Sequence, residues 1–306
     1  MGVALGLGAA LSWGFADYFA ALAARRVGAL RVVLGLHFAA LIPLTALVLA
    51  TDALARVTLG QVALFVLIGA VGWMSYLAFY GALGIGPISV LSPIVSGYAA
   101  VTVLLAVAIG GNHLSVVQAA AVGITIAGAM SASADVRAMA RAKLERRSAL
   151  GFVLALAAMI LLGGFVFGVS YFRQRIGWLG PIFLARGFAA AFVLGHVLVD
   201  ARRRRRGMAR RPPARGRRRP PARPDRRAGK LVAIMALLAL LDTGGYVCFN
   251  LGVGHAPTAI VAAASAPYAV VPIVMGVSLL RERPSRTQWL GIGLVIAGVV
   301  VLGAVA

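Results

Sequence analysis

The sequence is poor in acidic residues and in charged residues of either sign. Only 12% of its 306 residues are charged, and Asp and Glu together number eight. A soluble domain of this size needs about a quarter of its residues charged to cover its surface with solvated groups. With 61% hydrophobic residues and a mean hydropathy of +0.94, the chain is too apolar for an ordinary soluble protein.

Cysteine and catalytic motifs are equally scarce. The single cysteine, Cys248, excludes an intrachain disulfide and a multi-cysteine metal site, and we expect it to act as a small apolar packing residue. HExxH, GxSxG and Walker A patterns are all absent, and the histidines are His37, His113, His196 and His255. We therefore expect no enzymatic activity, no cofactor and no resident metal.

Long apolar segments fill most of the chain. A bilayer core of about 30 Å requires about 20 mostly apolar residues per helix, and unbroken runs of this length exclude barrel strands. The segments are 2–24, 29–50, 61–81, 87–109, 115–134, 149–172, 179–199, 231–251, 257–280 and 287–305. The sequence therefore predicts an all-α membrane protein with ten transmembrane helices. The first segment lacks a basic leader and has full spanning length, so we expect it to be retained.

The chain also repeats itself. Leu83-Gly84-Ile85-Gly86-Pro87 recurs as Leu251-Gly252-Val253-Gly254-His255-Ala256-Pro257, with two extra residues before the proline. At one constant offset, Pro87, Tyr98, Gln118 and Ala127-Gly128 recur as Pro257, Tyr268, Gln288 and Ala297-Gly298. Trp13-Gly14-Phe15 stands near the place of Gly163-Gly164-Phe165. Five helices per copy is an odd number, so the second copy enters the membrane from the opposite side. We expect two inverted repeats, 1–134 and 149–306, joined by a basic linker over 135–148, around a central cavity.

Basic residues collect in alternate loops. The loops after the first, third, fifth, seventh and ninth spans hold nearly all of them, and basic loops stay cytoplasmic, so this charge rule puts both termini outside. The loop over 200–230 is rich in Arg and Pro, and we expect it to be disordered. It serves either as a topology anchor and spacer or as a contact for anionic lipid headgroups. Because it has no aromatic residue on which bases can stack, nucleic acid is not expected as a partner.

These features resemble the EamA-type branch of the drug/metabolite transporter superfamily over essentially the whole chain. The resemblance is carried by Leu11-Ser12-Trp13-Gly14, by Gly86-Pro87, and by Leu280-Arg281-Glu282-Arg283-Pro284 followed by Gln288-Trp289-Leu290-Gly291 and Ile296-Ala297-Gly298. It implies a ten-helix basket around a cavity and export or exchange of amino acids, metabolites, sugar nucleotides, drugs or lipid-linked sugars. The chain departs from the family pattern at Arg281-Glu282 and Gly111-Asn112, where relatives have Gly-Glu. Relatives are usually described with cytoplasmic termini, contrary to the charge rule.

Charged side chains inside a span are costly, so each must be paired, neutralised or in a wet cavity. Asp242 lies halfway along the eighth span, and Tyr246 and Asn250 share its helix face. We expect a cavity-lining stripe in which Asp242 binds a cationic group or a coupling proton, or else makes a structural hydrogen bond to a neighbouring helix. The adjacent Thr243-Gly244-Gly245 is small enough to let backbone approach a ligand.

Two further charged residues lie within spans. Asp17 shares a face with Trp13 in the first span, and it either lines the cavity or forms an interfacial ion pair with Arg25 and Arg26. Arg186, in the seventh span, is either the counter-ion of one of the two acids or a site for an anionic substrate, unless it extends toward the membrane surface.

The remaining candidates are uncharged side chains and a histidine. Trp73, Tyr76 and Tyr80 form a stripe that either holds a cation or an aromatic ligand or only packs. His37 is either a proton relay or a packing donor. Weaker candidates are Ser92 and Ser96 in the fourth span and Ser265 with Tyr268 in its counterpart. Kinks at Pro93, Pro267 and Pro272 either act as hinges or shape the bundle.

The sequence as a whole favours a secondary transporter in the plasma membrane that exports or exchanges a small amino acid-like or drug-like solute by alternating access, with proton coupling as an option. A flippase for a lipid-linked sugar and a non-transporting scaffold or sensor are the alternatives. The expected partners are a small-molecule substrate and membrane lipids, and the protein is expected to be a monomer or a homodimer.

Overall fold

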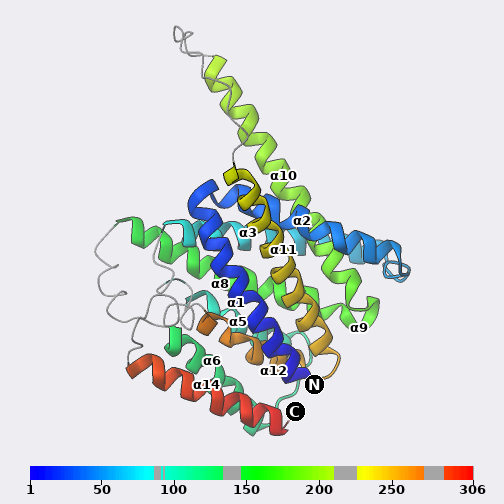
Figure 1. Cartoon of the computed structure of the whole chain (residues 1–306). Helices are drawn as coiled ribbons and strands as arrows, with labels where there is room; N and C mark the ends of the chain where they lie inside the picture. The colour runs from blue at the N-terminus through cyan, green and yellow to red at the C-terminus, as the bar shows by residue number, and fades with distance from the viewer. Residues whose placement is uncertain (86–90, 92–93, 134–145, 210–225, 272–285, 306) are drawn as a thin grey trace.

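The fold of the described residues is entirely helical (Figure 1). The structure is a computed structural model that describes residues 1–85, 91, 94–133, 146–209, 226–271 and 286–305. The long helices are α1 (Gly2–Val27), α2 (Ala29–Leu49), α3 (Leu59–Ile85), α8 (Arg146–Tyr171), α10 (Leu179–Ala209) and α11 (Arg226–Val253). The shorter ones are α5 (Tyr98–Ala108), α6 (Val116–Ser133), α9 (Arg173–Ile176), α12 (Thr258–Ser265), the 3₁₀ helix η1 (Ala266–Ala269) and α14 (Arg286–Val305).

Six of these helices are long and apolar enough to cross a membrane. Four shorter apolar helices, Ile94–Ala108, Val116–Ser131, Thr258–Tyr268 and Trp289–Val305, lie at the positions of the other four expected spans. The all-helical membrane class is therefore confirmed for the described residues, while the count of ten spans stays a prediction. Ser92, Pro93, Pro272 and the Arg281-Glu282 motif lie outside the described residues.

The Arg-rich segment differs from expectation at both of its ends. Disorder was expected from residue 200, but α10 continues as helix to Ala209, and α11 begins at Arg226. Arginine is a strong helix former, so a membrane helix that emerges into water through a run of arginines has no local reason to stop. Figure 1 shows this part of α10 projecting from the end of the molecule opposite the two termini.

Helices α6 and α14 show how the two copies are oriented. They run antiparallel, since Gln118 at the start of α6 donates a hydrogen bond from Nε2 to the carbonyl oxygen of Val305 at the end of α14, at 3.0 Å. Gly128 lies against Gly291 and Val295, and its counterpart Gly298 lies against Ala121 and Thr125, which are the counterparts of those two residues in the first copy. The crossing is therefore reciprocal, as contacts across a twofold axis must be.

Helices α1 and α2 obey the same symmetry with α8 and α10, but at a shorter offset, since their counterparts are separated by fewer residues than Pro87 and Pro257 are. Gly14 in α1 lies against Val271 and the Tyr268 carbonyl, and Gly163 in α8 lies against Val101 and the Tyr98 carbonyl. This correspondence makes α8 the counterpart of α1. At the same shorter offset, Gly28 and Gly177 both adopt positive φ (85° and 78°) just before α2 and α10, a backbone region that favours glycine.

The longer offset, which relates Pro87 to Pro257, also relates α3 to α11. Buried residues Gly69, Gly72, Tyr76 and Phe79 fall on the buried residues Ala239, Asp242, Tyr246 and Phe249. The match of Leu83-Gly84 with Leu251-Gly252 runs two residues out of this register, so that sequence similarity is not a structural equivalence. The two offsets differ because the connection between α10 and α11 is longer than the corresponding connection between α2 and α3. The additional residues form the Arg- and Pro-rich segment.

The main contacts between helices have equivalent contacts when the two copies are interchanged. Helix α1 packs on α11 and α12, while its counterpart α8 packs on α3 and α5. Helices α2 and α10 pack on each other, as do α6 and α14. Alanine and glycine let α1 approach its neighbours closely, since Ala9, Ala16 and Ala20 are fully buried or nearly so, and close backbone contact is what holds helices together in lipid. The result is two oppositely oriented copies that meet along one pseudo-twofold axis.

Candidate functional site

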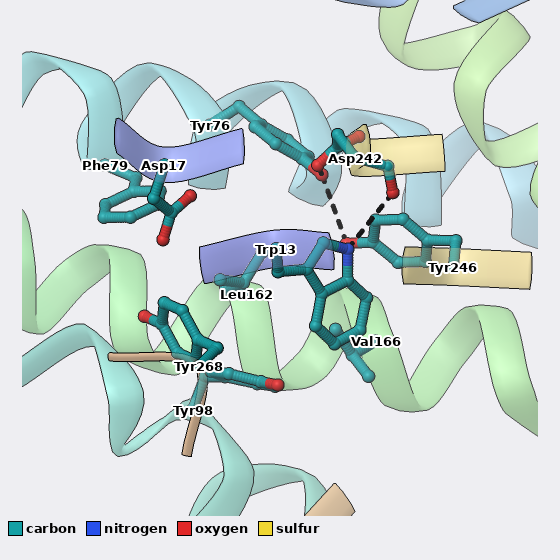
Figure 2. Close-up of a pocket in the computed structure, with 10 residues that line it drawn as sticks. All are labelled: Trp13, Asp17, Tyr76, Phe79, Tyr98, Leu162, Val166, Asp242, Tyr246 and Tyr268. Atoms are coloured by element: carbon teal, nitrogen blue, oxygen red, sulfur yellow. Dashed lines mark hydrogen bonds between the residues drawn. The ribbon is translucent and has the colours of Figure 1, made fainter. Parts of the chain in front are cut away.

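A cavity lies where the two copies meet (Figure 2). It is lined by Trp13, Asp17, Tyr76, Phe79 and Tyr98 from the first copy and by Leu162, Val166, Asp242, Tyr246 and Tyr268 from the second. Its volume is about 20 Å³, enough for about one water molecule and far below that of a small-molecule site. A metabolite can bind here only after the helices move apart.

Two pairs of tyrosines mark the symmetry axis within the cavity. The hydroxyl groups of Tyr76 and Tyr246 lie 3.3 Å apart, and the rings of Tyr98 and Tyr268 are 5.6 Å apart between centroids. The members of each pair are counterparts at the longer repeat offset. A residue that touches its own counterpart must lie beside the axis, so the cavity straddles it.

Asp242 is held in a buried ion pair. Its Oδ2 accepts a hydrogen bond from Arg186 Nη2, and its Oδ1 accepts one from the hydroxyl group of Tyr76 at 2.8 Å. The guanidinium group of Arg186 also lies over the rings of Tyr76 and Tyr246, 5.3 and 4.8 Å from their centroids. Of the expected roles of Arg186, the geometry is that of a counter-ion. Its charge and that of Asp242 neutralise each other.

Asp17 has a different environment. It is 92% buried, and its Oδ2 has no hydrogen-bond partner. No ion pair to Asp17, with Arg25 or Arg26 or any other cation, is found among the described residues. The hydroxyl groups of Tyr268 and Tyr80, both buried, also lack partners. Buried polar groups are nearly always hydrogen-bonded, and of these three residues Asp17 and Tyr268 line the cavity.

Trp13 is fixed by contacts with α11. Its Nε1 donates a hydrogen bond to the backbone carbonyl of Asp242 at 3.2 Å, and its ring meets Tyr246 edge-on, with centroids 4.9 Å apart. A Cβ atom on Gly245 would collide with the indole ring, and one on Gly244 would touch Ser12. The small Thr243-Gly244-Gly245 segment was expected to admit a ligand, but in this conformation Gly245 accommodates Trp13 and Gly244 lies against Ser12.

The other predicted site residues lie around the cavity and not in its lining. Asn250 donates a hydrogen bond to the backbone carbonyl of Tyr246 in its own helix, at 3.0 Å. Ser96 is buried, and Tyr80 stacks edge-on against Tyr76. Trp73 stacks on Phe192 of α10, with ring centroids 5.9 Å apart. His37 packs edge-on against Tyr76, 5.2 Å between ring centroids.

Four lining residues escaped the sequence prediction: Phe79, Tyr98, Leu162 and Val166. Each is apolar or is a tyrosine in an apolar helix, so none stands out by composition. The repeat offsets do contain the signal. Leu162 and Val166 are the counterparts of Trp13 and Asp17 at the shorter offset, and Tyr98 is the counterpart of Tyr268 at the longer one.

The symmetry of the site extends to its backbone and its tyrosines but not to its charges. Arg186 corresponds to His37, Asp242 corresponds to Gly72, and Asp17 corresponds to Val166. Each charged residue therefore has an uncharged or weakly basic counterpart. No group of three or more His, Cys, Asp or Glu side chains suited to a metal ion occurs in the described part of the chain.

Comparisons with known proteins agree with this architecture. One solved structure, titled only "Crystal structure of protein", superimposes over 100% of this chain and 97% of that chain with a TM-score of 0.67 and 15% sequence identity, which is evidence for the fold alone. No curated protein matches the sequence. The model of the EamA-like transporter family matches residues 1–134 and again 149–304. The chain therefore belongs to the EamA-like transporter family of the drug/metabolite transporter superfamily, whose members are multi-pass membrane transporters and not enzymes.

Proposed function

We propose that the protein is a secondary transporter that moves a small metabolite by alternating access, with the axial cavity as its substrate site. One observation carries the proposal: a buried cavity on the pseudo-twofold axis takes half of its lining from each copy and contains polar oxygens without partners. Substrate sites of inverted-repeat transporters lie at this interface. Rocking one copy against the other would open the cavity to one side of the membrane at a time.

The helices around the cavity have features that would permit such a motion. Helix α12 ends at Ser265, and the chain continues as the 3₁₀ helix η1, with Pro267 in its first turn. Proline removes a backbone hydrogen bond and loosens a helix at that point. Tyr268, a lining residue, follows directly, so a change of angle at Pro267 would move one wall of the cavity.

A cavity-filling substitution tests the site without altering its charge. Leu162 lines the cavity from α8, and we expect Leu162→Trp to fill the available 20 Å³ and reduce transport by at least tenfold. Leu156 lies on the same helix with 48% of its surface exposed, so Leu156→Trp is the matched control and should transport like the unmodified protein. Both variants would be reconstituted into liposomes and assayed by counterflow with a panel of amines, amino acids, sugars and nucleosides.

Two results would contradict the proposal. If no solute in the panel moves faster through the unmodified protein than through empty liposomes, the transporter assignment at this site fails. If Leu162→Trp and Leu156→Trp transport equally well, the axial cavity is not the pathway. Reconstituting with and without a pH gradient would show in the same experiment whether a proton is coupled. In this structure Asp17 is the candidate carrier of that proton, since Asp242 is already paired.

A further inference from the structure

We infer that the substrate is a small organic monocation, a protonated amine on an aromatic or aliphatic body, whose ammonium group binds Asp17. This inference rests on the proposed function and specifies the substrate class of the same site. It depends on the carboxyl group of Asp17, which supplies both a charge and an unpartnered oxygen, on the unpartnered hydroxyl group of Tyr268, and on the nature of the cavity walls.

When Asp17 is ionised, the site has one negative charge that no cation among the described residues balances. Asp17 and Asp242 are the charged residues of the lining. Arg186 is paired with Asp242 through Nη2 and lies over the rings of Tyr76 and Tyr246, so its charge is balanced although its Nη1 has no hydrogen-bond partner. A solute with a single positive charge restores neutrality in this buried place, where an unpaired charge is most costly.

The unpartnered oxygens favour a ligand that donates hydrogen bonds. Asp17 Oδ2 has only acceptor capacity when ionised, and the Tyr268 hydroxyl oxygen offers an acceptor lone pair. Both residues line the cavity and are at least nine-tenths buried. They come from different copies, so one ligand group between them bridges α1 and η1. A primary ammonium group has three N–H donors and satisfies both oxygens at once.

The walls suit an organic cation better than a metal ion. Eight of the ten lining residues are aromatic or aliphatic, among them Trp13, Phe79 and Tyr98. Aromatic faces attract ammonium and guanidinium groups, as the stacking of Arg186 on Tyr76 and Tyr246 in this site already shows. A hard metal ion would require several oxygen ligands, and the described residues form no such cluster.

The charged residues of the cavity lining also argue against anionic and zwitterionic solutes. A substrate carboxylate or phosphate would enter a cavity that already contains two carboxyl groups, and the described residues that line its walls include no unpaired cation. Like charges in a buried site disfavour each other strongly. The structure therefore narrows the expected amino acid-like or drug-like solute to an amine that lacks a carboxyl group.

Three probes with the same aromatic body separate these possibilities. Phenethylamine carries one positive charge, 2-phenylethanol is neutral, and phenylalanine is zwitterionic. Binding of each to the full-length protein in lipid nanodiscs would be measured by titration calorimetry. We expect phenethylamine to bind at least tenfold more tightly than either analogue. Equal or tighter binding of phenylalanine or 2-phenylethanol would overturn the inference.

Substitutions then locate the ammonium group. We expect Asp17→Asn to weaken phenethylamine binding by tenfold or more and Tyr268→Phe to weaken it by a few-fold. The matched control is Asp52→Asn, which removes an acid from an exposed position outside the cavity and should leave binding unchanged. An unaltered melting temperature of Asp17→Asn would show that it folds. If the folded Asp17→Asn variant binds phenethylamine as tightly as the unmodified protein, the assignment to Asp17 is refuted. If Asp17→Asn does not fold, Tyr268→Phe tests the site instead, because it leaves the carboxyl group intact.

The outcome separates this inference from the proposed function. If counterflow shows transport of an anionic or zwitterionic metabolite that excess phenethylamine does not inhibit, the substrate class is wrong while the transporter assignment stands. If no solute is transported, the proposed function fails, whatever phenethylamine binding shows.

Discussion

At the scale of single residues, Arg186 and Asp242 stabilise the protein only as a pair. Both are almost completely buried, and Tyr76 and Tyr246 surround them. Removing one partner leaves the other charge buried and uncompensated, which costs about 3–5 kcal/mol in typical proteins. Replacing both by apolar residues of similar volume is often neutral, because the desolvation cost of the two charges disappears with them.

This difference gives a prediction for the ion pair. We expect Arg186→Met and Asp242→Leu each to lower the unfolding free energy by about 3–5 kcal/mol, and the double variant to be more stable than either single one. Thermal unfolding of the purified proteins in detergent would measure the three values. Additive losses in the double variant would show that the two charges do not depend on each other.

The same residues show what the sequence could and could not predict. A charge inside an apolar span must be paired, neutralised or in a wet cavity, so pairing of Arg186 with an acid was one of the expected outcomes. The identity of that acid was not predictable, because sequence periodicity shows which residues share a face of one helix but does not show which helix packs against that face. The structure pairs Asp242 with Arg186 and shows no ion pair of Asp17 among the described residues, whereas the sequence had drawn attention to Asp242 as the residue that binds a cation or proton.

At the scale of helices, the crossing of α6 and α14 depends on two glycines. A Cβ atom added to Gly128 would lie 2.8 Å from Leu294 Cβ and from the backbone nitrogen of Val295. Because both helices are part of a close-packed contact, the backbones would have to separate to admit a larger side chain. Overpacking of this kind costs about 1–3 kcal/mol.

We therefore predict that Gly128→Leu and Gly298→Leu each lower the unfolding free energy by about that amount. Gly123 and Gly293 lie on the same two helices, are exposed, and have no neighbouring atoms within 4 Å of an added Cβ. The controls Gly123→Leu and Gly293→Leu should change it by less than about 0.5 kcal/mol. A similar loss in the controls and in the crossing variants would mean that close approach of the backbones is not what holds α6 to α14.

Helix positions were predictable because a helix that spans a bilayer needs a minimum number of consecutive apolar residues, and such segments can be recognised directly in the sequence. Helix ends were less so. Helix α10 continues beyond the apolar segment to Ala209, because once the helix emerges into water only the propensities of its arginines decide where it ends. The inverted arrangement also followed from the odd number of spans per copy, but the register of α3 against α11 did not follow from the most similar motif.

At the scale of the whole molecule, the C-terminal end of α10 and the two chain termini lie at opposite ends. Figure 1 shows both termini close together and the C-terminal part of α10 projecting at the far end, and the sequence of that part contains the arginine run over 202–206. Since basic loops remain cytoplasmic, this arrangement predicts that the termini are outside the cell, in contrast to the cytoplasmic termini usually described for relatives.

Cysteine labelling tests this orientation. In a Cys248→Ala background, we expect Ala304→Cys to react with a membrane-impermeant maleimide in intact cells and Ala201→Cys to react only after permeabilisation. Both positions are exposed, so a lack of reaction reflects the membrane and not burial. The opposite labelling pattern would reverse the orientation and show that the arginines of α10 do not set it.

The unequal distribution of charge between the two copies has a thermodynamic consequence. If the copies were identical, the conformations facing the two sides of the membrane would be related by the twofold rotation and equally populated. Here Arg186 and Asp242 belong to one copy and Asp17 to the other, so the two conformations differ in energy. A difference of about 1.4 kcal/mol changes their ratio tenfold. Without a substrate gradient, the protein should still favour either the inward-facing or the outward-facing conformation. Replacing these few charged side chains would shift that preference without changing the fold.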